Sequence, residues 1–153
     1  MRMIIRSLLL SLALLGCAET VSAAPKDPKT KPTPTTFKID VHRMIPMAYR
    51  SRSLDPGYSV EVRNDSLICY LPYVGQNYTA NPVGGVQLDF AVPIHSREQR
   101  EGRKGSQVIR FRCADGAAAY EFLITLWPNG RADVDVMPVT AQRISYDGKV
   151  VTE

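Results

Sequence analysis

Long hydrophobic runs are nearly absent from the sequence. The one run that stands out, Leu8–Ala18, has 11 residues and ends at Glu19, so it is too short to cross a bilayer as a helix. Long uninterrupted helices are not expected either, because 11 prolines and 10 glycines are scattered along the 153 residues. With 44% apolar and 22% charged residues, the composition excludes a collagen-like, coiled-coil or wholly disordered chain and suits a single soluble domain.

The motifs of several large enzyme classes are also missing. The sequence has no glycine-rich phosphate loop, no HExxH or CxxC motif and no nucleophile elbow. Its two histidines, His42 and His95, are far apart and adjoin no nucleophile or group of metal ligands. We therefore expect a protein that is not an enzyme and that carries no metal ion and no cofactor.

The excess of positive charge is small. Beyond residue 23 the chain has 17 basic and 14 acidic residues, a net charge of +3, because Arg2, Arg6 and Glu19 lie before that point. The main basic cluster, which Glu98 and Glu101 dilute, consists of Arg97, Arg100, Arg103 and Lys104. This pattern predicts a solvated loop, and we expect no nucleic-acid partner.

The first 23 residues have the features of a secretory signal, since Arg2 and Arg6 precede the apolar run. Two processing sites are open. Residues 21–23 (VSA) have the small side chains that ordinary signal peptidase needs, whereas residues 14–17 (LLGC) resemble a bacterial lipobox. We favour the lipobox, which would place a lipid on Cys17; in the alternative, Cys17 is a small apolar residue of a discarded signal. Either route predicts an exported protein, as an outer-membrane lipoprotein or in the periplasm.

Residues 24–36 (APKDPKTKPTPTT) contain four prolines, three lysines and no large apolar side chain. Such a segment cannot bury enough surface to offset the entropy of ordering it, so we expect an extended tether. A lipid on Cys17 would then hold the domain that follows, residues 37–153, at a membrane surface. About 115 residues are enough for one hydrophobic core.

The domain is dominated by alternating apolar and polar residues between turn signals, which is typical of antiparallel β-structure. A two-residue turn at Asn64-Asp65 sets Val62 opposite Leu67 and makes one face apolar. A two-residue turn at Asp115-Gly116 sets Phe111 opposite Tyr120. A three-residue turn, 128–130, sets Ile124 opposite Val134. It also places Asp133 and Asp135 on the outer side, where we expect a solvated face.

Further strands are predicted at 37–43, 86–92 and 143–146, which gives about eight strands in sequential order. Hairpins of this kind close into an up-and-down barrel like that of lipocalins or fold into a β-sandwich. We favour the barrel, because closure removes the edge strands. Cys69 and Cys113 both share parity with inward apolar residues, so the fold permits a disulfide; the alternative is two buried free thiols.

Several segments resemble the domain-of-unknown-function family 4251 of the Bacteroidota. They are residues 71–78 (LPYVGQNY), 58–62, 65–67, 128–130 and 144–148. The resemblance spans residues 37–150 and implies a small exported or lipid-anchored envelope protein with a lipocalin-type barrel and no assigned activity. The chain departs from the family pattern at Gln76-Asn77, where the family usually has a basic residue and an alanine.

One loop is unusual, the 14 residues 72–85 (PYVGQNYTANPVGG). Loops of this length inside a compact domain are often functional, and tyrosine and glycine suit close contact with a ligand. We therefore interpret Tyr73, Gly75 and Tyr78 as a binding site at one barrel mouth for a small apolar or saccharide-like ligand or an envelope protein; alternatively, both tyrosines plug the barrel. Other hypotheses are a structural envelope-assembly lipoprotein with an outer apolar patch at Leu123 and Trp127, and a hydrolase using His95.

Overall fold

The computed structural model describes residues 35–78 and 88–151, which form an almost all-β structure. Its strands are β1 (Phe37–Pro46), β2 (Arg52–Ser53), β3 (Ser59–Arg63), β4 (Ser66–Leu71), β5 (Leu88–Glu101), β6 (Gln107–Asp115), β7 (Ala118–Leu126), β8 (Arg131–Pro138) and β9 (Ile144–Val151). The helical content of this part is one three-residue 3₁₀ turn, η1 (Arg103–Gly105). Within these residues, no helix has the length and hydropathy that a bilayer span requires.

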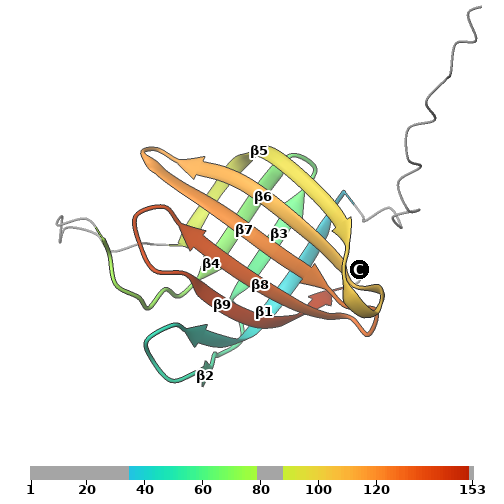
Figure 1. The fold of residues 1–153 in the computed structure, drawn as a ribbon, viewed down its shortest axis with the longest axis horizontal. Coiled ribbons are helices and arrows are strands. Elements are labelled where there is room, and N and C mark those ends of the chain that lie inside the picture. Colours follow the sequence, from blue (N-terminus) through green and yellow to red (C-terminus); the bar gives the residue numbers. More distant parts are fainter. Residues whose placement is uncertain (1–34, 79–87, 152–153) are drawn as a thin grey trace, which may run out of the picture.

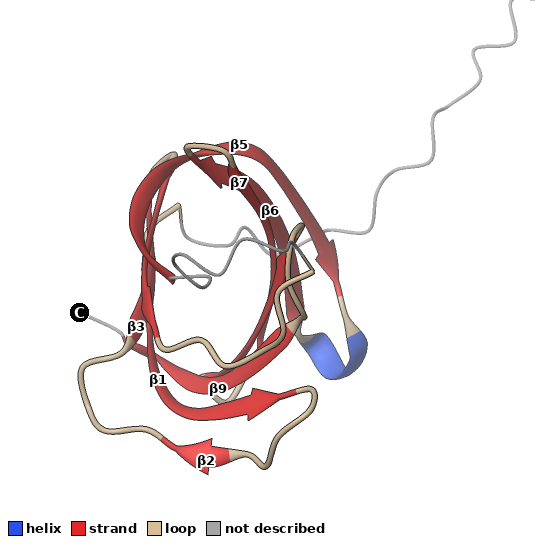
Figure 2. Cartoon of the chain, turned by 90° about the vertical axis from the view of Figure 1, so that its left-hand side faces the viewer, coloured by secondary structure: helices blue, strands red, loops and turns tan. Residues whose placement is uncertain are grey.

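Eight strands close into an antiparallel barrel, as the sequence predicted. The order around the ring is β1-β3-β4-β5-β6-β7-β8-β9, and β9 pairs with β1 to close it. Strand β2 pairs with Arg43 and Met44 of β1 and lies outside the ring (Figures 1 and 2). Apart from β2, each strand pairs with the next strand in the sequence. The topology is therefore an up-and-down meander, and the alternative β-sandwich is excluded.

The barrel interior is filled with apolar side chains from all eight strands of the ring. One fully buried residue from each, in ring order, is Ile39, Val60, Leu67, Leu88, Ile109, Phe122, Val134 and Tyr146. The ring of Phe90 contacts those of Tyr120 and Phe122, with centroids 4.9 and 6.2 Å apart. Burying each such side chain contributes about 1.5–3 kcal/mol. An eight-stranded barrel is just wide enough for this filling, so the interior is a core.

Two of the three hairpin predictions are confirmed. Val62 lies opposite Leu67 across the turn at Asn64-Asp65. Ile124 lies opposite Val134 across the three-residue turn 128–130. Gly130 has a φ of +82°, the left-handed conformation for which a glycine is best suited.

For the remaining hairpin, the predicted pairing of the strands is wrong by two residues, because the turn lies one residue further along the chain. Asp115 pairs with Ala118, so the turn is Gly116-Ala117, and Phe111 lies opposite Phe122 where we predicted Tyr120. Gly116 has a φ of +57°, and the first corner of a type II′ turn needs a positive φ, which favours glycine. Because the shift is two residues, the same side chains still face the interior.

Two strands switch their inward face part-way along, which strict alternation does not predict. In β1 the register with β9 shifts at His42, and the buried positions change from 37, 39 and 41 to 44 and 46. In β5 the register with β6 shifts at His95. Each histidine is the extra residue of a β-bulge, which bends the strand and redirects the side chains after it.

The bulge at His95 corrects the prediction for the basic cluster. Strand β5 continues to Glu101, so Arg97 and Arg100 belong to a strand where we expected a solvated loop. Arg97 lies opposite buried Phe111 and faces the interior, with its guanidinium carbon 5.6 Å from the centre of the Phe111 ring. Strand β9 is also longer than predicted, because it pairs with β1 along most of its length.

The barrel has two different ends. Strand β1 begins and β9 finishes at the end that carries the turns 64–65 and 128–130 and η1, which we call the turn end. The opposite end carries residues 47–51, 72–78 and 139–143, and we call it the loop end (Figure 1). Residues 72–78 of the unusual loop therefore lie at the end of the barrel opposite the start of β1.

Candidate functional site

Tyr73 packs back onto the barrel at the loop end. Its side chain lies against the core, and its hydroxyl donates a hydrogen bond to the carbonyl oxygen of Gln142, 2.7 Å away. Burial raises the pKa of Tyr73 above its usual value. Tyr146 from the core donates a similar bond to the carbonyl oxygen of Pro72, at 2.7 Å. The loop is thus fastened to the barrel at Pro72 and at Tyr73.

Gly75 is needed for the position of the Tyr73 ring. A Cβ at Gly75 would overlap the Tyr73 hydroxyl oxygen and lie 2.7 Å from Cζ of that ring. The backbone at Gly75 does not have a positive φ, so the requirement is for space. The two predicted site residues are therefore in contact, and Gly75 leaves the space in which the Tyr73 ring packs onto the loop end of the barrel.

Residues 76–78 run antiparallel to residues 140–142. The Gln142 amide donates to the Gln76 carbonyl at 2.9 Å, and the Tyr78 amide donates to the Thr140 carbonyl at 2.7 Å. Asn77 forms a β-bridge with Ala141. Tyr78 remains exposed after this pairing. Residues 79–85 of the predicted loop lie outside the described residues.

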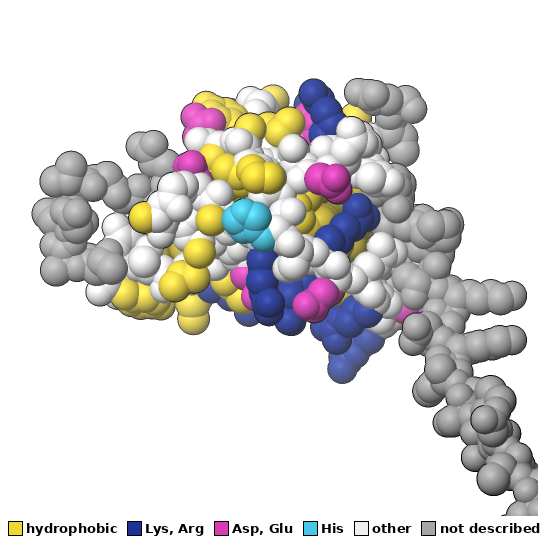
Figure 3. All heavy atoms as spheres, turned by 90° about the horizontal axis from the view of Figure 1, so that it is seen from above, with side chains coloured by type: hydrophobic (Ala, Val, Ile, Leu, Met, Phe, Trp, Pro, Cys, Tyr) yellow, Lys and Arg dark blue, Asp and Glu magenta, His cyan; other side chains and the backbone are white. Residues whose placement is uncertain are grey.

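Exposed hydrophobic side chains gather at the loop end. Met47, Tyr49, Tyr78 and Val139 are 72, 56, 67 and 71% exposed. We call these four residues the loop-end patch. In Figure 3 hydrophobic side chains are visible over the left-hand part of the molecule, and most Lys and Arg side chains lie toward its middle and right. A group of large exposed apolar residues is typical of a surface that contacts another molecule.

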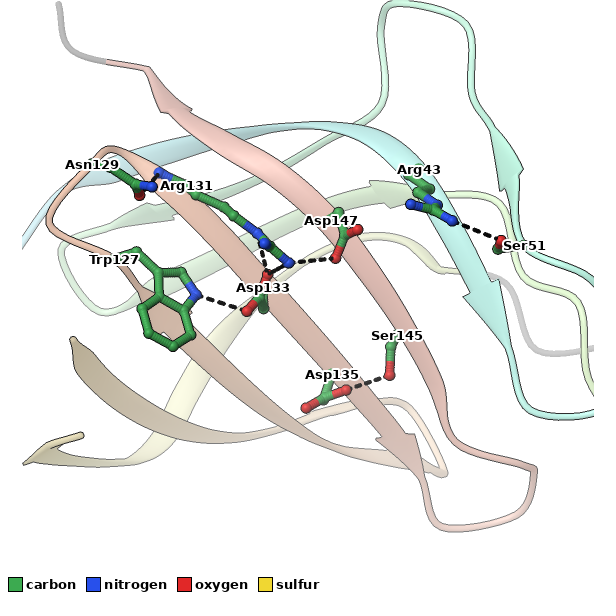
Figure 4. Close-up of polar contacts among 9 residues, drawn as sticks. All are labelled: Arg43, Ser51, Trp127, Asn129, Arg131, Asp133, Asp135, Ser145 and Asp147. Carbon is green, nitrogen blue, oxygen red and sulfur yellow. Dashed lines mark hydrogen bonds and ion pairs between the residues drawn. The ribbon is translucent and has the colours of Figure 1, made fainter. Parts of the chain in front are cut away.

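The aspartates on the outer face form a paired network (Figure 4). Asp133 accepts hydrogen bonds from the Trp127 indole at 2.7 Å and from the Arg131 guanidinium at 3.1 Å. Asp135 accepts from the Ser145 hydroxyl and pairs with Arg143 at 2.8 Å. Their outward direction, opposite Thr125 and Leu123, is as predicted. Each carboxylate has a cationic partner, and both aspartates are half-buried where we expected a solvated face.

Two grooves adjoin each other on the outside of β1. The first, of about 430 Å³, lies between β1 and the connection from β2 to β3. The second, of about 420 Å³, lies over β1 and β9 beside the turn 128–130. Both are lined by His42 and Lys149. We call the pair the His42 grooves. One signal in the sequence points to these grooves, because the two adjacent polar residues His42 and Arg43 interrupt the alternation of β1.

The profile of the family described as "Domain of unknown function (DUF4251)" matches residues 33–150. The chain belongs to the DUF4251 family. A crystal structure of a DUF4251 family protein from Bacteroides eggerthii has a similar fold, with a TM-score of 0.56 at 10% sequence identity over 76% of this chain and 79% of that one. No curated protein matches the sequence. The resemblance inferred from residues 71–78 and the flanking segments is therefore confirmed.

In this DUF4251 domain Cys69 and Cys113 are separate buried thiols. Cys69 on β4 lies opposite Phe90, and Cys113 on β6 lies opposite Ile94, so β5 runs between them. Two strands that flank a third are about 9.5 Å apart, beyond the Cα separation of about 7 Å that a disulfide allows. Burial raises the pKa of the Cys113 thiol to about 11 and that of Cys69 further still. These thiols therefore have little thiolate character at neutral pH.

The histidines of the DUF4251 domain lie on different sides of the barrel. Strands β3 and β4 separate His42 on β1 from His95 on β5. Among residues 35–78 and 88–151, no three His, Cys, Asp or Glu side chains are placed to hold a metal ion together.

Proposed function

We propose that this DUF4251 protein is a non-catalytic interaction module of the bacterial envelope that binds a partner protein through the loop-end patch. The observation that carries the proposal is that four large apolar side chains, Met47, Tyr49, Tyr78 and Val139, are exposed at one end of the barrel. Core side chains fill the interior of the barrel, so an enclosed ligand site has little support. A partner would instead bind to an outer surface.

The position of the patch also favours this function. Strand β1 begins at the turn end, so the segment that leads back to Cys17 joins the barrel opposite the patch. With a lipid on Cys17, residues 18–36 would reach up to about 60 Å if extended, which would let the patch meet a partner away from the membrane surface. A periplasmic protein cut after Ala23 would present the same patch. The Bacteroides source of the similar crystal structure supports an envelope of this bacterial type.

The other two hypotheses have less support. A structural lipoprotein was expected to expose Leu123 and Trp127, yet both are half-buried, and the Trp127 indole is bonded to Asp133. A hydrolase needs convergent polar groups, whereas His42 and His95 lie on separate strands. We therefore keep the binding module as the proposed function.

Site-specific photo-crosslinking in a bacterial envelope tests the patch. A photoreactive residue replaces Tyr78 or Val139 in the full-length chain, and Lys104 or Arg63 in the controls, which are exposed at the turn end. We expect one adduct of defined mass from both loop-end positions and none from the controls. The loss of that adduct in a Met47→Ser, Tyr49→Ser chain would confirm the surface. Equal adducts at all positions, or none at the loop end, would contradict the proposal.

Anchoring is tested separately. Metabolic labelling with a fatty acid should label the wild-type chain and should not label the Cys17→Ser chain. Mass spectrometry should show that the mature chain begins at Cys17. A mature chain that begins at Ala24 would instead establish a periplasmic protein and would leave the proposed partner surface intact.

A further inference from the structure

We propose that the His42 grooves form a binding site for a phosphorylated sugar. The two grooves share His42 and Lys149 in their linings, and their volumes of about 430 and 420 Å³ lie within the range of small-molecule sites. The site is on the outer wall of the barrel, so it is distinct from the loop-end patch. The proposal does not depend on the proposed function.

The walls of the grooves are fixed by the bulge in β1. On one side of His42, the Val41 amide donates to the Tyr58 carbonyl at 2.9 Å; on the other, the His42 carbonyl accepts from the Leu54 amide at 2.9 Å. These bonds hold the connection from β2 to β3 against β1 as one wall. A bulge leaves its extra residue unpaired in the ladder and turns its side chain, here His42, toward the outside.

Gly148 allows β9 to approach β1 closely beneath the grooves. A Cβ at Gly148 would lie 2.6 Å from the Asp40 carbonyl oxygen and 2.7 Å from Cγ2 of Ile39. A larger residue would force the two strands apart at the bulge. The close approach of the two strands under the second groove therefore depends on this glycine.

The charges of the grooves favour an anion. Four cations and two carboxylates line them: Lys38, Arg43, Arg131, Lys149, Asp40 and Asp147. Asp40 pairs with Lys38 at 3.8 Å, and Asp147 pairs with Arg131 at 3.6 Å. Lys149 has no acidic partner within 4 Å in the described residues, and the Arg43 guanidinium donates to the neutral Ser51 hydroxyl at 3.0 Å. Neither cation forms an ion pair within 4 Å in the described residues, although in the ladder Arg43 lies opposite Asp147 and Lys149 lies opposite Asp40. With four cations against two carboxylates, the lining carries a net charge of +2.

The remaining lining indicates what carries the anion. Leu54, Pro56 and Tyr58 give the first groove an apolar wall on the far side of His42 from the turn 128–130. The carbon face of a sugar ring packs on such a wall, whereas its hydroxyls bond to polar side chains such as Ser59 and Asn129. A phosphate between Arg43 and Lys149 would accept charge-assisted hydrogen bonds from both. The apolar wall suits the sugar ring and the cations suit the phosphate, so the grooves together fit a phosphorylated sugar better than inorganic phosphate alone.

The test is titration of the purified full-length protein with glucose 6-phosphate, with glucose and inorganic phosphate as the other soluble probes. We expect glucose 6-phosphate to bind more tightly than either, with amide chemical-shift changes at His42, Leu54 and Lys149. The Arg43→Gln, Lys149→Gln chain should lose about tenfold or more in affinity, the equivalent of one charge-assisted hydrogen bond. The matched control, Arg50→Gln, Arg103→Gln, removes the same charge from exposed positions elsewhere and should change affinity less than about twofold.

Three results would overturn the proposal. An equal loss of affinity in the two double variants would mean that general surface charge attracts the ligand. No saturable binding of glucose 6-phosphate below about 10 mM would mean that the grooves are not a site. Binding to phosphatidylglycerol vesicles but not to the soluble sugar phosphate would assign the cations to a lipid surface. Unchanged thermal unfolding of the variants is the control for folding.

Discussion

The side chain of Tyr73 occupies the space that a side chain at Gly75 would need. A Cβ at Gly75 would lie 2.7 Å from Cζ of the tyrosine ring, and the ring is held in place by the hydrogen bond from its hydroxyl to the Gln142 carbonyl. We therefore expect Gly75→Ala to lower the free energy of unfolding by about 1–3 kcal/mol, as overpacking does elsewhere. Urea denaturation of the full-length chain measures this change.

A double-mutant cycle identifies the cause. In a Tyr73→Ala chain the ring is absent, so Gly75→Ala should cost much less there than in the wild type. Tyr73→Phe keeps the ring and removes the hydroxyl that donates to Gln142. Tyr73→Phe should lower the free energy of unfolding by about 0.5–1.5 kcal/mol. In the Tyr73→Phe chain, Gly75→Ala should still lower it, by part of the amount found in the wild type. Strictly additive effects of Tyr73→Ala and Gly75→Ala would contradict the contact.

Alternation in the sequence was enough to predict the barrel and its interior. It placed Val60, Phe111, Phe122 and Val134 on inward faces, and all four are fully buried. The reason is that side chains alternate with a period of two. Moving a turn by one residue, as at Gly116, shifts the pairing of the strands by two residues and leaves every side chain on the correct face. The two turns with the clearest local chemistry, at 64–65 and 128–130, were predicted at the right positions.

The features that sequence reasoning missed are those in which alternation fails. A bulge adds one residue to a strand and reverses parity beyond it, so Arg97 was assigned to a solvated loop and the groove at His42 was not expected. The contact of Tyr73 with Gly75 joins residues of one loop through a bond to Gln142, which lies far along the chain. Such a long-range partner cannot be read from a single sequence.

The inward direction of Arg97 predicts that it contributes more to stability than its neighbour. Arg97 is half-buried and its guanidinium lies over the Phe111 ring, whereas Arg100 on the same strand is exposed. We expect Arg97→Ala to lower the free energy of unfolding by about 1–2 kcal/mol through lost packing and the lost cation–π contact. Arg100→Ala should change it by less than about 0.5 kcal/mol. Equal values in thermal or urea unfolding would place Arg97 outside the interior.

The separation of Cys69 and Cys113 by β5 predicts two free thiols in the domain. A Cys17→Ser chain, prepared without reductant and then unfolded, should react with two equivalents of Ellman's reagent. The folded chain should react far more slowly at pH 8, because burial raises the pKa of both thiols and limits access to them. Reaction of fewer than two equivalents after unfolding, restored by prior reduction, would show a disulfide and contradict the register of β4, β5 and β6.

Burial of the Cys113 thiol and the Tyr146 hydroxyl predicts a loss of stability at alkaline pH. Burial raises the pKa of Cys113 to about 11 and raises that of Tyr146 above its usual value. A group whose pKa is higher in the folded chain keeps its full contribution below its unfolded pKa and loses it as the pH rises toward its folded pKa. For the thiol this interval runs from about pH 9 to pH 11, with a slope of up to about 1.4 kcal/mol per pH unit. The free energy of unfolding, measured with urea, should fall as the pH rises through this interval. In the Cys113→Ala chain the same free energy should fall less steeply. If the two chains have the same slope, Cys113 is accessible to water in the folded state.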